Sequence, residues 1–157
     1  MSTTRLSDAI AGLLAAYQAA PALAGVPVYD GAQASGAADQ DFLIVGHDGT
    51  MGPDGTLEAT ALAGIYLQNW ADSTDGREET GSVNCLIVSQ TGDAADLAGR
   101  RARVKVLLTA AEDAAAAAVV SHLTFDGTTD GRFIYRQSAG GAVVMCAYRV
   151  AYSAPWG

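Results

Sequence analysis

The residues best suited to acid–base chemistry in this sequence are His47 and Asp48, which stand side by side. They follow the apolar run 42–46 and open a glycine-rich stretch, and catalytic side chains often lie in loops at the ends of strands. The pair predicts either a catalytic histidine or a loop histidine that Asp48 holds by a local hydrogen bond. The second histidine, His122, is expected at the end of a helix, where a protonated imidazole interacts favourably with the helix dipole.

No spacing typical of a metal or nucleotide site occurs. The histidines and cysteines show neither CxxC nor HxxxH spacing. The stretch 48–55 resembles a calcium loop only faintly, because it lacks carboxylates at alternate positions and a terminal Glu, and ordinary Asp-Gly turns explain it. Dinucleotide, triphosphate and nucleophile-elbow motifs are absent. The sequence therefore predicts no metal, no cofactor and no catalytic residue, so we expect a protein that is not an enzyme.

Cys85 and Cys146 both lie within apolar, strand-like runs. We interpret them as buried thiols that pack as small hydrophobic side chains. A disulfide would require their strands to be adjacent, and the sequence leaves open whether they are close.

Charged residues are distributed unevenly. The chain has 9 Lys and Arg against 17 Asp and Glu, a formal net charge of −8, which argues against a grip on nucleic acid or a polybasic membrane surface. One acidic loop, expected to be exposed, carries Asp72, Asp75, Glu78 and Glu79. One basic cluster lies on an expected helix and consists of Arg100, Arg101, Arg103 and Lys105. The acidic loop is either a solvated surface or the wall of a channel that must not bind a polyanion, and the basic cluster would then face a neighbouring subunit.

The hydrophobic pattern predicts the elements that position these residues. Helical spacing predicts one helix from about residue 2 or 3 to 20 and a second, capped by Thr91 or Asp93, from about 94 to 120. The residues that keep the second period include Val104, Leu107 and Val119. Strands are expected near 26–29, 42–46, 57–71, 82–90, 132–137 and 142–152, and Asp-Gly pairs at 126–127 and 130–131 are expected to form turns. Residues 82–90 should form a central strand that is covered on both faces.

The strands are consecutive rather than alternating with helices. This pattern predicts a single domain over residues 1–157 of the α+β class, with a mainly antiparallel sheet, an N-terminal helix and one long helix packed on one face. No apolar run is long enough to span a bilayer, and the N-terminal segment is not typical of a signal peptide. We therefore expect the cytoplasm, or a particle assembled there.

Several short phrases, in this order, resemble the tail terminator family of long-tailed phages, of the type encoded in actinobacterial phages and prophages. They are AGVPVYDG at 24–31, FLIVG at 42–46, a long strand with Trp70, SVNCLIVSQTGD at 82–93, AGRRA at 98–102 and RVAY at 149–152. The resemblance is one of layout and short phrases over most of the chain.

The resemblance implies a structural virion protein that forms a hexameric ring at the head-proximal end of the tail tube. Such a ring terminates tube polymerisation and joins the tail to the head connector, and DNA passes through it without sequence-specific binding. The implied partners are further copies of the chain, the tail tube protein and connector proteins, with no membrane. The implied location is the virion, after assembly in the host cytoplasm.

Three alternatives remain. The first is a head-completion or stopper protein of the same connector. The second is a monomeric adaptor, outside any virus, that binds a protein through its sheet edge. The third is an enzyme that uses His47 and Asp48.

Overall fold

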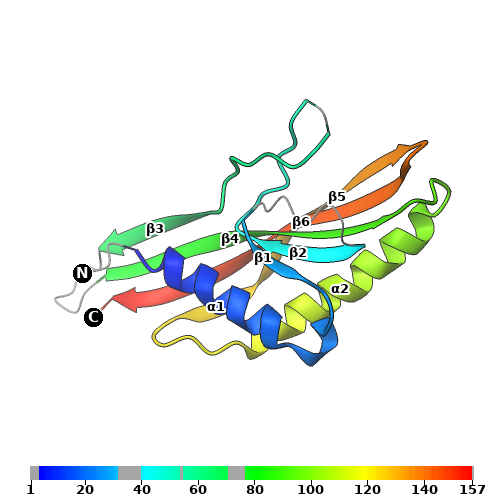
Figure 1. Ribbon diagram of the computed structural model, residues 1–157. Coiled ribbons are helices and arrows are strands. Elements are labelled where there is room, and N and C mark those ends of the chain that lie inside the picture. The colour runs from blue at the N-terminus through cyan, green and yellow to red at the C-terminus, as the bar shows by residue number, and fades with distance from the viewer. Residues whose placement is uncertain (1–3, 32–39, 54, 71–76, 157) are drawn as a thin grey trace.

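The computed structural model describes residues 4–31, 40–53, 55–70 and 77–156. Their elements follow the order α1 (Leu6–Ala19), a 3-10 turn η1 (Pro21–Leu23), β1 (Val28–Asp30), β2 (Asp41–Val45), β3 (Gly64–Trp70), β4 (Arg77–Thr91), α2 (Leu97–Ala117), β5 (Thr124–Ser138) and β6 (Gly141–Trp156). The N-terminal helix, the single long helix and the mostly antiparallel sheet confirm the α+β prediction (Figure 1).

The sheet is built around the two long strands β4 and β6, which pair antiparallel over their whole length. Its order is β1-β2-β4-β6-β5, and only the β1–β2 pair is parallel. Strands β2 and β3 share one side of β4, with β2 against residues 85–89 and β3 against residues 77–83. As a result β3 forms one edge of the sheet at the end of β4 that lies away from β2 (Figure 1).

Both helices pack on one face of the sheet, which we call the helix face. The main core lies there, where Leu13 and Tyr17 of α1 and Val104 and Leu107 of α2 are buried with strand residues. Leu6, Ile10, Leu14, Leu97 and Leu108 are partly buried against the same core, so the predicted helix faces are confirmed. The periodic spacing of these residues places them on one side of each helix, and burial of that side stabilises the packing.

A smaller core covers the opposite face, which we call the loop face. Phe42, Ile44, Leu86, Val88, Met145 and Ala147 are buried there, and Met51 and Leu57 of the loop after β2 pack against them. The middle of β4 is therefore buried from both sides, as its apolar run predicts.

Several predicted boundaries differ from the structure. Helix α2 begins at Leu97 because Asp93 accepts a hydrogen bond from the Ala95 N–H in a turn, and it ends at Ala117. Val119 therefore lies beyond the helix and is 95% exposed, so its predicted place on the buried period is wrong. Residues 57–70 of the expected strand 57–71 are described, and of these only Gly64–Trp70 form a strand.

The two predicted turns after α2 are irregularities inside β5. The register of β5 against β6 shifts between Phe125 and Gly127 and again between Thr129 and Arg132. Gly127 (φ 125°) and Asp130 (φ 55°) adopt the positive φ angles that turns also use. A β-bulge and a turn therefore select the same residues, which is why the Asp-Gly pairs were misleading.

The two cysteines lie on adjacent strands but not opposite each other, since Cys85 pairs with Tyr148 and Cys146 with Ile87. Both are buried free thiols, as predicted. Burial raises the pKa of Cys85 to about 12, so this thiol is unreactive near neutral pH. None of the helices among the described residues is long and apolar enough to cross a membrane.

Candidate assembly surfaces

The predicted acidic loop divides into residues with different surroundings. Asp72 and Asp75 lie outside the described residues. Glu78 and Glu79 belong to β4, where Glu78 is exposed and Glu79 is completely buried. The expectation of an exposed loop is therefore wrong for Glu79, because this side chain points to the helix face.

Glu79 fixes the start of α1 to the end of the sheet. Its Oε1 accepts hydrogen bonds from the Thr4 hydroxyl, the Arg5 backbone N–H and the Tyr152 hydroxyl, each at 2.8 Å. Its Oε2 accepts one from Gln68 Nε2 at 2.9 Å. A carboxylate at this position also interacts favourably with the positive end of the helix dipole.

The donors around Glu79 determine its charge state. Burial by itself would raise the pKa of Glu79, but hydrogen bonds from Gln68, Tyr152, Thr4 and the Arg5 N–H outweigh that effect. The net result is a pKa below the ordinary value, so the buried carboxylate stays ionised at neutral pH.

Gly81 makes room for this arrangement. It pairs with Tyr66 on β3 and with Tyr152 on β6. A Cβ at Gly81 would lie 2.4 Å from the Ile65 carbonyl oxygen and 2.7 Å from the Tyr152 hydroxyl. Only glycine leaves the space through which Tyr152 reaches Glu79.

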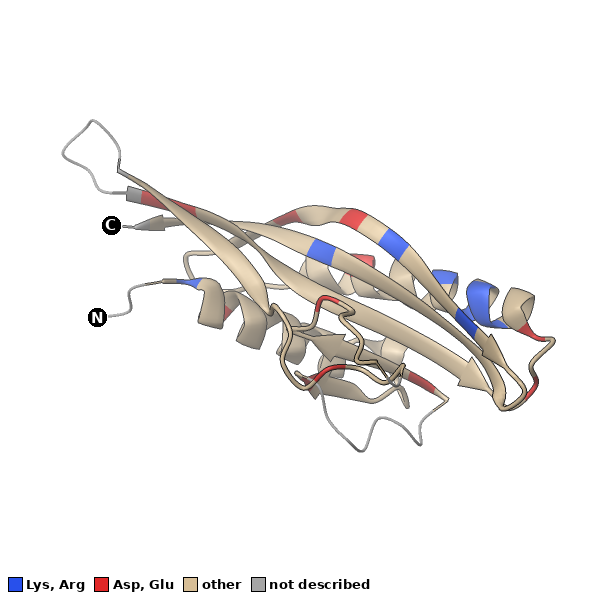
Figure 2. Ribbon diagram, turned by 90° about the horizontal axis from the view of Figure 1, so that it is seen from above, with Lys and Arg blue, Asp and Glu red and all other residues tan. Residues whose placement is uncertain are grey.

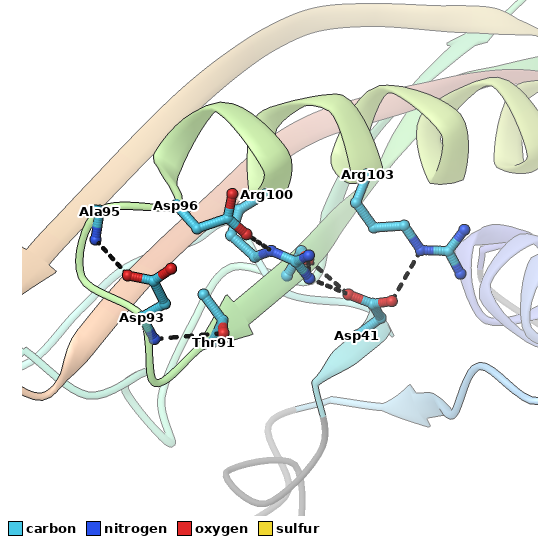
Figure 3. Close-up of polar contacts among 8 residues, drawn as sticks. Asp41, Thr91, Asp93, Ala95, Asp96, Arg100 and Arg103 are labelled. Carbon is cyan, nitrogen blue, oxygen red and sulfur yellow. Dashed lines mark hydrogen bonds and ion pairs between the residues drawn. The ribbon is translucent and has the colours of Figure 1, made fainter.

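The predicted basic cluster also divides. Arg103 Nε lies 2.8 Å from Asp41 Oδ2, and an Arg100 guanidinium nitrogen lies 3.8 Å from Asp41 Oδ1 (Figure 3). Arg100 also contacts Asp96 at 3.3 Å and donates to the Ser89 hydroxyl at 3.1 Å. These two arginines attach α2 to the start of β2 within one chain.

The other two members of the basic cluster remain on the surface. Arg101 and Lys105 are exposed, and the Arg101 guanidinium lies 5.9 Å from the centre of the Tyr135 ring of β5. Sequence alone did not separate these pairs, because the partner Asp41 lies about sixty positions from Arg103.

His47 is a structural residue of the loop that follows β2. It is 1% exposed, its Nδ1 accepts the Gly49 N–H at 2.9 Å, and its Nε2 lies 2.9 Å from the Glu58 carbonyl oxygen. Since Nδ1 is an acceptor, Nε2 must carry the proton and donate it. Asp48 instead accepts from the Thr50 backbone and hydroxyl, so the predicted His47–Asp48 hydrogen bond is not formed.

The described residues contain no group of three His, Cys, Asp or Glu side chains that could hold a metal ion. What the described surface does present is exposed apolar side chains on the edge strands β3 and β5. Ile65, Tyr66 and Leu67 of β3 are 51%, 50% and 61% exposed, and Phe133 and Tyr135 of β5 are 47% and 48% exposed. These residues could not be identified as exposed from the sequence, because apolar alternation identifies a strand and does not distinguish an edge strand from a central one.

Comparisons with known proteins identify a solved structure with a similar fold. No family model matches the chain, and no curated protein matches it. Among solved structures, the chain is similar to one in a structure described as the virion of a native gene transfer agent (GTA) particle. The similarity covers 94% of this chain and 94% of that one, with a TM-score of 0.51 and 18% sequence identity. At this identity the similarity establishes a shared fold.

Proposed function

We propose that this chain is a structural protein of a phage-like virion, and that its copies form a hexameric ring at the head-proximal end of the tail tube. The observation that carries the proposal is the similarity over nearly the full length of both chains to a chain of a gene transfer agent virion. The resemblance of the sequence to tail terminators, at residues 24–31, 42–46, 82–93 and 98–102, supports the more specific role.

In this role the chain ends polymerisation of the tail tube and provides the surface to which the head connector binds. This task is geometric, so no side chain needs to exchange a proton or bind a cofactor. The surroundings of His47 support this view, because both ring nitrogens are already engaged with backbone groups. We propose accordingly that the chain has no catalytic activity.

The test is removal of the gene from cells that produce the particle, followed by electron microscopy of the particles. If the chain terminates the tube, tails become variable in length and often longer, and they separate from heads that are filled with DNA. Restoring the unchanged gene should restore tails of uniform length that are attached to heads.

Two other results would contradict the proposal. Tails of normal length together with heads that have lost their DNA would identify a head-completion or stopper protein. Particles that are unchanged in structure and infectivity would exclude a role in the virion and favour an adaptor outside it.

A further inference from the structure

The sheet has edge strands on two opposite sides of the molecule: the three-residue β1 and the longer β3 lie on one side, and β5 lies on the other. Among the described residues β3 pairs with β4 alone and β5 with β6 alone, and β4 and β6 lie between them (Figure 1). Edge strands present unpaired backbone groups, and natural proteins usually protect them with charges, bulges or covering loops. In this chain bulges interrupt the first half of β5, whereas residues 132–138 of β5 and all of β3 pair regularly.

Both regular edges carry large apolar side chains that the described residues leave about half exposed. Burying an apolar side chain away from water is favourable, so an exposed one loses that stabilisation. Several exposed apolar side chains next to one another indicate a surface that contacts a partner. We define the β3 edge by Ile65, Tyr66, Leu67 and the adjacent Glu78, and the β5 edge by Arg132, Phe133, Tyr135 and Arg136.

The two edges match face by face. Tyr66 pairs with Gly81 and lies on the helix face, and so do Phe133 and Tyr135, which pair with core residues Cys146 and Val144. Ile65 and Leu67 pair with Ser82 and Thr80 and lie on the loop face. If two sheets meet edge to edge, aromatic side chains therefore face aromatic side chains on the helix side.

Charges on the loop face are complementary. Glu78 lies there beside Asn69 at the β3 edge, and Arg132 and Arg136 lie there at the β5 edge. Arg132 and Arg136 donate to the Asp48 and Gly55 carbonyl oxygens, which orients the guanidinium groups without neutralising them. Figure 2 shows the basic residues on α2, β5 and β6, and the acidic pair near the far end of β4.

We propose that the β3 edge of one copy binds the β5 edge of the next copy. The two surfaces differ and lie on opposite sides of the chain, so the contact is head-to-tail and closes into a ring when the rotation is right. The inference rests on the proposed ring function and names its subunit interface. It assigns Glu78 to contact with a neighbouring subunit, in place of the channel wall.

Cysteine pairs test this interface, because both native thiols are buried. The double variant Tyr66→Cys/Phe133→Cys places one thiol on each edge, and β4 and β6 prevent a bond within one chain. The variant chain is assembled into particles, mildly oxidised and separated on a denaturing gel. We expect a ladder of linked chains from dimer to closed ring, and a single-chain band from each single variant.

A matched control is Tyr66→Cys/Val119→Cys, since Val119 is exposed and lies between the end of α2 and the start of β5, outside the residues that define either edge. The control should remain a single chain after oxidation. Particles with normal tails and no ladder from the test pair would overturn the interface and leave the ring function standing. A disulfide-linked dimer from a single variant would also overturn it, because one accessible thiol per chain can link two chains only where like edges meet. Absence of the chain from the particles would instead overturn the proposed function.

Discussion

Glu79 holds the start of α1 against the strands at one end of the sheet. Four donors, two from the residues just before α1 and one each from β3 and β6, converge on one carboxylate of β4, so a single side chain joins the start of the first helix to three strands of the sheet. A buried carboxylate is favourable only when its oxygens are satisfied in this way. The cluster therefore has a structural role, in spite of its acidic character in the sequence.

Glu79→Gln should lower the free energy of unfolding by about 1.5–3 kcal/mol at neutral pH, the range for hydrogen bonds to a charged group. Glu78→Gln is the matched control, because this neighbour is exposed, and should change stability by less than about 0.5 kcal/mol. Chemical denaturation of the purified variants measures both. Equal midpoints for the two variants would show that the buried hydrogen bonds contribute nothing.

The lowered pKa of Glu79 also predicts a pH dependence. A carboxyl whose pKa is lower in the folded state adds stability at pH values above its unfolded pKa, near 4.3, and loses it as the pH falls through the folded pKa. The unchanged chain should therefore lose more stability between neutral and acidic pH than Glu79→Gln does. Parallel stability curves for the two proteins would contradict this explanation.

Little of this cluster could be predicted from the sequence. Thr4 and Tyr152 lie more than seventy positions from Glu79, and no local sequence pattern indicates that they form hydrogen bonds with it. The same holds for Asp41 and its two arginines. The sequence therefore predicted a basic surface at Arg100 and Arg103, whereas in the structure both arginines form ion pairs with Asp41 of the same chain.

At the scale of elements, the helices were the most predictable part. Their apolar residues recur with the helical period, and that pattern is local. The sequence predicted that these segments form strands but not which of them lie at the edges of the sheet, because strand order depends on pairing between distant segments. The bulges in β5 were misread because the residues that permit them are those of turns.

Helix α2 should depend on its buried side. Leu107 is 1% exposed and Val106 is 57% exposed, so adjacent positions provide a matched pair. Leu107→Ala should lower the free energy of unfolding by about 2–5 kcal/mol, whereas Val106→Ala should change it by less than about 0.5 kcal/mol. Thermal or chemical unfolding with the same probe compares them. An unchanged midpoint for Leu107→Ala would mean that this side of α2 is not part of the core.

At the scale of the whole molecule, the charge of −8 per chain is multiplied by assembly. Negative charge on a channel wall would keep passing DNA from binding, because it removes any gain from counterion release. The prediction of a channel-facing acidic segment now rests on Asp72 and Asp75, since Glu79 is buried and Glu78 is assigned to the interface.

The double variant Asp72→Lys/Asp75→Lys should fold and assemble but eject DNA more slowly. The double variant Glu112→Lys/Asp113→Lys, at two exposed positions of α2, changes the net charge by the same amount and is the control for that change alone. Ejection can be followed by the fluorescence of a DNA-binding dye after particles are triggered. Normal ejection by the double variant would exclude an electrostatic role for these residues.

The most direct test of the central claim is the position of the chain in the particle. A small tag on the C-terminal residue, labelled with gold and viewed by electron microscopy, shows where the copies lie. Label is expected at a single level, between head and tail, on every complete particle. Label along the tail tube or on the head shell, or no label on purified particles, would contradict it.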